Sequence, residues 1–67
     1  MSSLRVGQLV RALSTITESG LPSDPHVHGR PGDLGQVEDI TDGFPTVRFL
    51  ASGTATIVHP RQVRGAE

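Results

Sequence analysis

Two histidines, His26 and His28, lie one residue apart in the stretch HVHGRPGDLGQVEDI, which covers residues 26–40. In an extended chain, residues two positions apart point to the same side, so both imidazoles could reach one metal ion. A transition-metal site needs a further ligand, which His59 or Asp24 could supply. The sequence therefore predicts, as one alternative, a metal site made of His26, His28 and His59. The other alternative is an exposed loop without a ligand.

Three glycines in the same stretch, Gly29, Gly32 and Gly35, resemble the spacing of a phosphate-binding loop. Such a loop needs a helix after the glycines, because the helix N-terminus meets the anion. Here QVEDI follows, which is typical of a strand. We therefore interpret Gly32 and Asp33 as a turn, and Gly35 as a position where the chain bends steeply or approaches another strand closely.

No catalytic residues are predicted. Glu38, Asp39 and Asp42 lie near an expected hairpin tip, where carboxylates are usually solvated, and they lack calcium-loop spacing. Ser14, Ser52 and the histidines are too scattered in the sequence to be linked as nucleophile and base. We therefore expect a protein that is not an enzyme and that has no cofactor.

Length and composition narrow the class of protein. The 67 residues allow a single domain, residues 1–67, with an ordered core at about residues 7–64. The net charge of −1 argues against binding to nucleic acid, and two aromatic residues, Phe44 and Phe49, are too few for stacking platforms. Neither a signal peptide nor an apolar run of membrane-spanning length is present in the sequence. We expect a cytoplasmic protein with no membrane partner.

Short β-type runs alternate with glycine and proline along the whole chain, and no gap between these turn residues fits a long amphipathic helix. Asp-Gly within residues 42–45 is a strong hairpin signal, and Ser52-Gly53 indicates a second tight turn. The expected strands are residues 8–17, 35–41, 46–51, 54–58 and 63–64, with a long loop at 18–27 and one helical turn at 59–62.

This pattern predicts an all-β fold, a small five-stranded SH3-like barrel with a long first loop and one 3-10 turn before the last strand. A strongly bent antiparallel sheet can cover one apolar face with few residues, which suits so short a chain. Alternation along the strands gives the expected core: Val10, Ala12, Val37, Val47, Phe49, Ala55, Ile57 and Val63.

Three arginines on or near the later strands, Arg48, Arg61 and Arg64, are the candidate partner-binding residues. Arginine is favoured in the ion pairs of protein interfaces. The alternative is that these side chains belong to a solvated outer face of the sheet.

Four segments in this order resemble the NifZ domain of nitrogen-fixation operons: GQLVRALSTITESGLPSDP, VHGRPGDLGQVEDI, TVRFL and VHPRQV. The shared pattern is a Gly-x-x-Val-Arg strand, a variable loop, a Gly-x-x-Gly-x-Val turn, a Val-x-Phe strand and a polar turn into Val or Leu. The variable chain of ferredoxin–thioredoxin reductase and a small stromal protein of photosystem I have a similar layout and are SH3-like barrels. The matching positions, within residues 7–64, are Gly7, Val10, Gly32, Gly35, Val37, Val47, Phe49 and Val63.

The resemblance to NifZ implies an accessory protein that assists the maturation of nitrogenase metalloclusters by binding the immature enzyme. The resemblance to the reductase chain implies a structural subunit that clamps a cluster-bearing catalytic chain. Neither role involves redox chemistry by this chain, in agreement with its lack of cysteine.

We therefore expect a non-enzymatic, protein-binding accessory module, whose partner is a metalloenzyme or its assembly apparatus. Strand edges and the long first loop would make the contacts. Two alternatives remain: a protein that binds or delivers metal through His26, His28 and His59, and a ribosomal-type SH3-like protein that binds nucleic acid.

Overall fold

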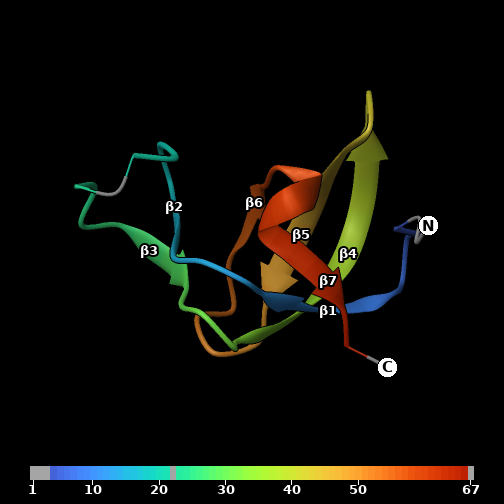
Figure 1. The fold of residues 1–67 in the computed structure, drawn as a ribbon, viewed down its shortest axis with the longest axis horizontal. Helices are drawn as coiled ribbons and strands as arrows, with labels where there is room; N and C mark the ends of the chain where they lie inside the picture. Colours follow the sequence, from blue (N-terminus) through green and yellow to red (C-terminus); the bar gives the residue numbers. More distant parts are fainter. Residues whose placement is uncertain (1–3, 22, 67) are drawn as a thin grey trace.

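The computed structural model describes residues 4–21 and 23–66. Within them, five strands form an antiparallel sheet in the order β6-β5-β4-β1-β7, and two short strands, β2 and β3, form a hairpin (Figure 1). Residues 1–3 and 67 of the predicted domain, and Pro22 of the predicted loop, lie outside the described residues. The elements are β1 (Leu9–Ala12), β2 (Ile16–Thr17), β3 (Val27–Gly29), β4 (Leu34–Thr41), β5 (Phe44–Phe49), β6 (Ala55–Ile57), the 3-10 turn η1 (Pro60–Gln62) and β7 (Val63–Gly65).

The prediction of an all-β fold is confirmed, including a 3-10 turn immediately before the last strand. Pairing does not close the sheet into a barrel in the described part of the chain, because β6 pairs only with β5 and β7 pairs only with β1. Among the same residues there is no helix with the length and apolar character that a membrane span requires.

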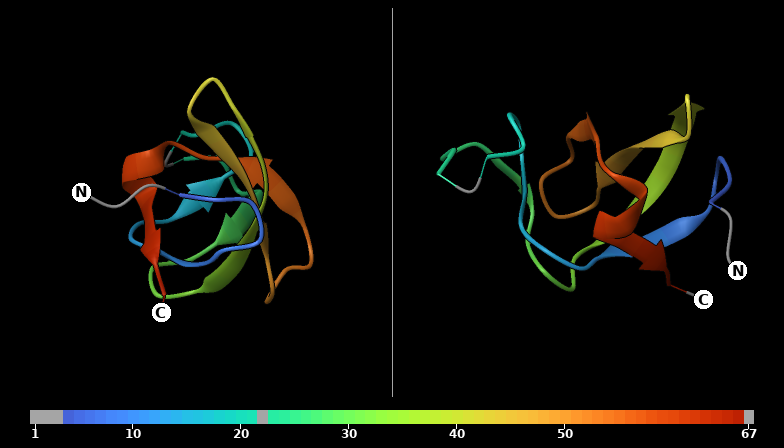
Figure 2. Two further views of the ribbon diagram at one scale, coloured as in Figure 1. Left: turned by 90° about the vertical axis from the view of Figure 1, so that its right-hand side faces the viewer. Right: turned by 45° about the horizontal axis from the view of Figure 1, so that its top comes forward.

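The predicted first strand, residues 8–17, is wrong in its extent, because it is divided into β1 and β2. At the break, the backbone N–H of Gly32 donates to the carbonyl of Ala12, and the N–H of Leu13 donates to the carbonyl of Gln62. The chain then leaves the five-stranded sheet, and Ile16 and Thr17 pair with β3 instead. The predicted long loop is therefore mainly the connection of a β2–β3 hairpin, which projects from one side of the sheet (Figures 1 and 2).

The two turns around β4 follow the sequence signals. Asp42 and Gly43 have φ angles of 53° and 81°, as the tight Asp-Gly hairpin between β4 and β5 requires. Before β4, Gly32 has a φ of 92°, and the carboxylate of Asp33 accepts the backbone N–H of Arg30. The predicted turn at Gly32 and Asp33 is therefore confirmed.

Pro45 was expected in the first hairpin turn and lies instead in β5, where its side chain is fully buried. A proline lacks a backbone donor, so a central strand usually excludes it. On the side that faces β6, Pro45 serves as a hydrogen-bond acceptor: its carbonyl accepts the backbone N–H of Val58.

The core lies between the curved face of the sheet and the start of the hairpin. Six of the expected core residues are buried, but Ala55 is only partly buried and Ile57 is exposed, so the predicted orientation of this strand is wrong. Ile57 lies opposite Thr46, whose side chain points outward, whereas Val58 turns inward. The buried hydrophobic cluster is Val10, Ala12, Ile16, Val37, Val47, Phe49, Val58 and Val63.

Candidate functional site

The side chain of His59 caps the 3-10 turn. Its Nδ1 atom accepts the backbone N–H of Arg61 at 3.1 Å, and the Gln62 side chain accepts the backbone N–H of His59 at 2.9 Å. Together these bonds form a capping box, with Pro60 at the first position of the turn. The imidazole also packs edge-on against the ring of Phe44, with the centroids 5.5 Å apart. These contacts give His59 a structural role.

His26 lies in the loop between β2 and β3, with its side chain 81% exposed. Asp24 organises this loop: its carboxylate accepts the backbone N–H groups of His26 and of Ser19, each at 2.9 Å. The hydrogen bond from the His26 backbone is the largest of several that hold the pKa of the Asp24 carboxyl far below its usual value. Asp24 therefore fixes the loop while ionised.

His28 lies on β3, and its side chain is only 10% exposed. Its Nε2 atom is 2.5 Å from Glu18 Oε1, and its Nδ1 atom is 2.6 Å from Thr54 Oγ1. The Oγ atom of Ser52 lies 2.8 Å from Thr54 Oγ1. A carboxylate, an imidazole and two hydroxyls thus form one continuous chain, which we call the His28 cluster: Glu18, His28, Ser52 and Thr54.

The three predicted metal ligands occupy three different hydrogen-bonded settings. His26 is held by Asp24, His28 by Glu18 and Thr54, and His59 by its own 3-10 turn. Within residues 4–21 and 23–66, no three side chains of His, Asp or Glu are grouped as a metal site would need. The hydrogen bonds instead assign each histidine a local partner.

The His28 cluster is not predicted by the sequence. Ser52 and the histidines are scattered along the chain, and neither Thr54 nor Glu18 has a predicted chemical role. The fold brings them together because the hairpin places β3 beside the Ser52–Thr54 turn, across 26 residues of sequence from His28 to Thr54. A hydroxyl and a carboxylate at such separations carry no local sequence signal.

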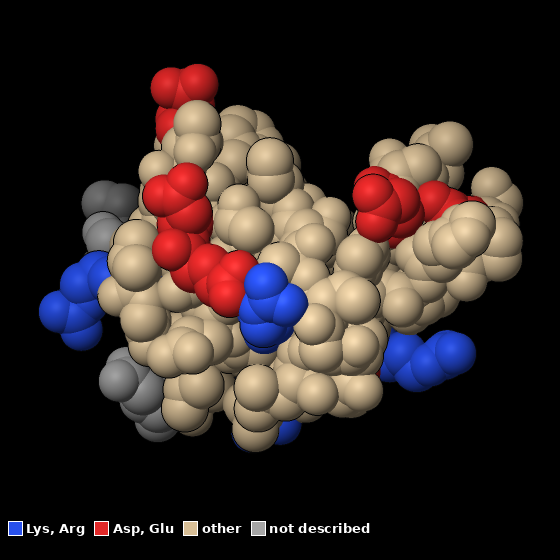
Figure 3. Space-filling model, turned by 180° about the vertical axis from the view of Figure 1, so that it is seen from behind, with Lys and Arg blue, Asp and Glu red and all other residues tan. Residues whose placement is uncertain are grey.

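The three candidate arginines lie on three different elements. Arg48, on β5, forms an ion pair with Glu38 at 2.6 Å and donates to the Gly53 carbonyl at 2.8 Å, and the bond to Glu38 raises the pKa of its guanidinium. Arg61 lies in η1, and Arg64 lies in β7, on the far side of β4 and β1 from Arg48. Seen from behind, basic groups are spread apart while acidic groups gather in clusters (Figure 3). Partner binding by these arginines stays a prediction.

Exposed apolar side chains mark the outer face of β5 and β6. Ile57 is 63% exposed and Phe44 is 43% exposed. Phe44, Thr46 and Ile57 share this face, because Phe44 and Thr46 are two residues apart on β5 and Ile57 lies opposite Thr46. We call Phe44 and Ile57 the outer apolar pair.

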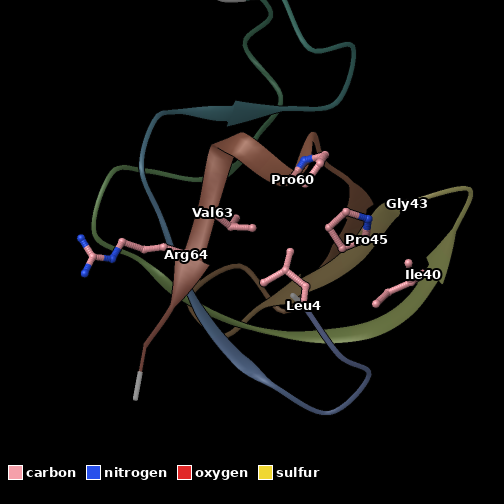
Figure 4. Close-up of a pocket in the computed structure, with 7 residues that line it drawn as sticks. All are labelled: Leu4, Ile40, Gly43, Pro45, Pro60, Val63 and Arg64. Atoms are coloured by element: carbon pink, nitrogen blue, oxygen red, sulfur yellow. The ribbon is translucent and has the colours of Figure 1, made fainter. Parts of the chain in front are cut away.

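A recess of about 340 Å³ lies beneath the N-terminal segment, between the β4–β5 hairpin, η1 and β7 (Figure 4). The Leu4 side chain reaches into it, whereas the guanidinium of Arg64 extends away from it. The lining contains no acid, imidazole or hydroxyl, so it offers packing space and no acid–base chemistry. The lining residues are Leu4, Ile40, Gly43, Pro45, Pro60, Val63 and Arg64.

Replacing Asp24 with asparagine is expected to loosen the β2–β3 loop. The amide is a weaker acceptor than the carboxylate, so the backbone N–H groups of Ser19 and His26 should exchange with deuterium faster. Folding lowers the pKa of Asp24, so the ionised carboxylate contributes to the free energy of unfolding. This contribution is complete above pH 3.8, the ordinary pKa of the group, and is lost progressively as the pH falls further.

Hydrogen exchange measured by NMR at neutral pH checks the expected faster exchange. The chemical-shift dispersion of spectra recorded at about pH 2 checks the expected loss of stability in acid. Asp42→Asn is the matched control, since Asp42 is exposed at a hairpin tip where asparagine also accepts a positive φ. Equal protection of Ser19 and His26 in both variants would contradict the role of Asp24.

In comparisons with known proteins, no family model, curated protein or solved structure matches the chain significantly.

Proposed function

We propose that this chain is an accessory module that binds a metalloenzyme, or an assembly intermediate of one, through the free edge of β6. The observation that carries the proposal is the combination of an edge of β6 that is unpaired among residues 4–21 and 23–66 with the outer apolar pair beside it. An extended segment of the partner would add to the sheet as a further strand.

The register of β6 identifies the backbone groups at its free edge. Thr56 pairs with Val47, and the N–H of Val58 donates to the carbonyl of Pro45. In an antiparallel ladder, residues alternate between groups that bond the neighbouring strand and groups that point away from it. The N–H and C=O of Ala55 and Ile57 therefore face away from β5, where an added strand could bond them.

The outer apolar pair would supply side-chain contacts to such a strand. Ile57 itself lies on the edge strand, and Phe44 lies at the start of β5, supported by the ring of His59. Aromatic and aliphatic anchors near an interface centre carry most of the binding free energy, whereas exposed charges at the rim contribute little. Ile57 is therefore the side chain whose replacement should weaken binding most.

The class of partner rests on the resemblance to NifZ and on an SH3-like arrangement of the chain. Three features support that arrangement: the strand order β6-β5-β4-β1-β7, the hairpin inserted between β1 and β4, and the 3-10 turn before β7. The proposed partner is nitrogenase before its metalloclusters are complete. The catalytic chain of ferredoxin–thioredoxin reductase is the alternative partner.

Binding to purified, cluster-deficient nitrogenase tests the proposal directly. We expect Ile57→Glu to weaken binding about tenfold or more, because a charge would replace a central apolar contact. Leu50→Glu is the matched control, since Leu50 is also 63% exposed but lies in the turn after β5. Calorimetric titration of both variants and the unmodified chain gives the dissociation constants.

Equal weakening by both variants would show that the surface of β6 is not the binding site. Absence of binding to cluster-deficient nitrogenase by the unmodified chain would remove that partner. A parallel titration against the catalytic chain of ferredoxin–thioredoxin reductase then distinguishes the alternative partner from a wrong functional class.

A further inference from the structure

We propose that the His28 cluster is an acyl-transfer site, in which Thr54 is the nucleophile, His28 is its general base and Glu18 positions the base. The site would cleave small, neutral esters, in contrast to the expectation from the sequence that the protein is not an enzyme. It is adjacent to the binding surface proposed above, because Thr54 directly precedes Ala55 of β6. This proposal gives a chemical activity to the β2–β3 hairpin, for which the protein-binding proposal provides no role.

The proton positions in the cluster follow from the chemistry of its members. An ionised carboxylate can only accept a hydrogen bond, so the Nε2 atom of His28 must carry a proton toward Glu18. When the ring is neutral, its Nδ1 atom has a free lone pair that can accept the hydroxyl proton of Thr54, whose Oγ1 atom lies 2.6 Å away. This is the protonation state that a general base requires.

Ser52 is the donor at the end of this chain of hydrogen bonds. Because the Thr54 proton points to His28, the Thr54 oxygen is the acceptor for the hydroxyl of Ser52 at 2.8 Å. Ser52 also accepts the backbone N–H of Thr54 at 3.3 Å, which fixes its own side chain. The oxygen of Thr54 is therefore held in one orientation while its proton faces the base.

The site combines a fixed base with an accessible nucleophile. The His28 side chain is nearly buried, whereas Thr54 is exposed. A hollow of about 370 Å³ lies against the cluster, a volume within the range of small-molecule sites. Its lining residues are Glu18, His26, Val27, His28, Ser52 and Thr54.

The reaction has two balanced steps. In the first, Thr54 Oγ1 attacks the ester carbonyl carbon, its proton passes to His28 Nδ1, and the C–O bond to the leaving group breaks as that proton moves to the departing alcohol. In the second, His28 takes a proton from water, the resulting hydroxide attacks the acyl carbon, and the Thr54–acyl bond breaks. Thr54 recovers its proton from His28, and a carboxylic acid is released.

The lining of the hollow sets the substrate class. Glu18 places a negative charge at its edge, so an anionic ester would be repelled, while Val27 and the methyl group of Thr54 favour a short aliphatic acyl group. Neutral short-chain esters fit both conditions. p-Nitrophenyl acetate has this chemistry, and it releases a coloured product.

The experiment measures p-nitrophenyl acetate hydrolysis by the full chain, together with mass spectrometry of the quenched protein. We expect a rate above that of equimolar free imidazole and an acetyl group on Thr54. Thr54→Val and His28→Gln should each reduce the protein-dependent rate at least tenfold, because positioned acid–base groups contribute about 10²–10⁴-fold. Thr54→Ser should retain activity, since it keeps the hydroxyl.

Thr41→Val is the matched control for Thr54→Val, because Thr41 is an exposed threonine at the end of β4 and does not line the hollow. Its rate should equal that of the unmodified chain. NMR spectra of all variants establish that they remain folded. Acetylation confined to His26, to Ser52 or to the terminal amine, or a folded Thr54→Val variant with an unchanged rate, would overturn the proposal.

Glu18 has its own test as a positioning residue. In Glu18→Gln, the amide can donate to Nε2, so the ring can place its proton on Nδ1 and lose the ability to accept from Thr54. We expect a lower kcat together with a change in the ¹⁵N chemical shifts of His28 toward the Nδ1–H tautomer. An unchanged tautomer with full activity would remove Glu18 from the site.

Discussion

Replacing Phe49 with alanine is expected to lower the free energy of unfolding by about 3–5 kcal/mol. Phe49 is fully buried at the end of β5 and is the largest side chain of the hydrophobic core. A domain of this length buries a smaller fraction of its surface than a larger one, and folded domains are stable by only about 5–15 kcal/mol. The variant should therefore be largely unfolded at moderate urea concentrations.

The surroundings of Phe49 explain why the loss should lie near the top of that range. Its ring packs against two glycines: a Cβ atom added to Gly29 would lie 2.8 Å from the ring, and one added to Gly35 would lie 3.1 Å from it. Glycines have no side chain that could relax into the space left by the ring. The cavity would remain open, and an unfilled cavity adds to the lost transfer free energy.

Urea unfolding followed by circular dichroism measures the effect. Phe44→Ala is the matched control, because the chain contains two phenylalanines and Phe44 is 43% exposed. We expect a loss of less than about 1 kcal/mol for this variant, since surface substitutions usually have small effects. Phe49→Leu should fall between the two, and it provides a measurable value if Phe49→Ala does not fold. Equal midpoints for Phe49→Ala and Phe44→Ala would contradict the burial of Phe49.

The sequence was sufficient to predict the strands whose ends carry strong turn residues. Asp42-Gly43 marks the β4–β5 hairpin, and alternation then orients Val37, Val47 and Phe49 inward. The break between β1 and β2 has no such signal, because the residues at the break resemble those of a strand. The chain turns there because Leu13 bonds to Gln62, a contact that local sequence cannot predict.

The orientation of β6 shows a second limit. Apolar residues stand at positions 55, 57 and 58, so either face of this short strand could be the buried one. The pairing of β6 with β5 determines which face is buried. Thr56 lies opposite the buried Val47, which places Val58 inward and Ile57 outward. The exposed Ile57 on which the proposed binding surface rests was therefore predicted as a core residue.

The spacing of His26 and His28 suggests a site in the sequence, but the hydrogen-bond partners of these histidines cannot be predicted from it. His28 meets Thr54 across 26 residues and Glu18 across 10, through a hairpin that was expected to be a loop. Spacing within HVH suggested a shared ligand, whereas the fold gives His26 and His28 different hydrogen-bond partners. The chemistry of the candidate site is thus a property of the tertiary contacts.

Replacing Gly35 with alanine is expected to destabilise the fold by about 1–3 kcal/mol, the usual cost of overpacking a core. A Cβ atom there would lie 2.5 Å from Val47 Cγ1 and 3.0 Å from the carbonyl oxygen of Arg48. Gly35 lies in β4 with no positive φ, so backbone strain does not contribute. The expected loss of stability therefore comes from the close approach of β4 and β5, which Gly35 in the stretch HVHGRPGDLGQVEDI suggested.

A double-mutant cycle with Val47→Ala tests this cause. Val47→Ala alone creates a cavity, but it also removes the atom closest to the new Cβ. The cost of Gly35→Ala should therefore be smaller by about 1 kcal/mol in the Val47→Ala background than in the unmodified chain. Some cost should persist, because the Arg48 carbonyl is backbone and cannot be removed. Gly35→Ala would ordinarily stabilise a strand by about 0.5–1 kcal/mol, so a neutral or stabilising effect, or additivity in the cycle, would show that β4 and β5 are not in close contact at this position.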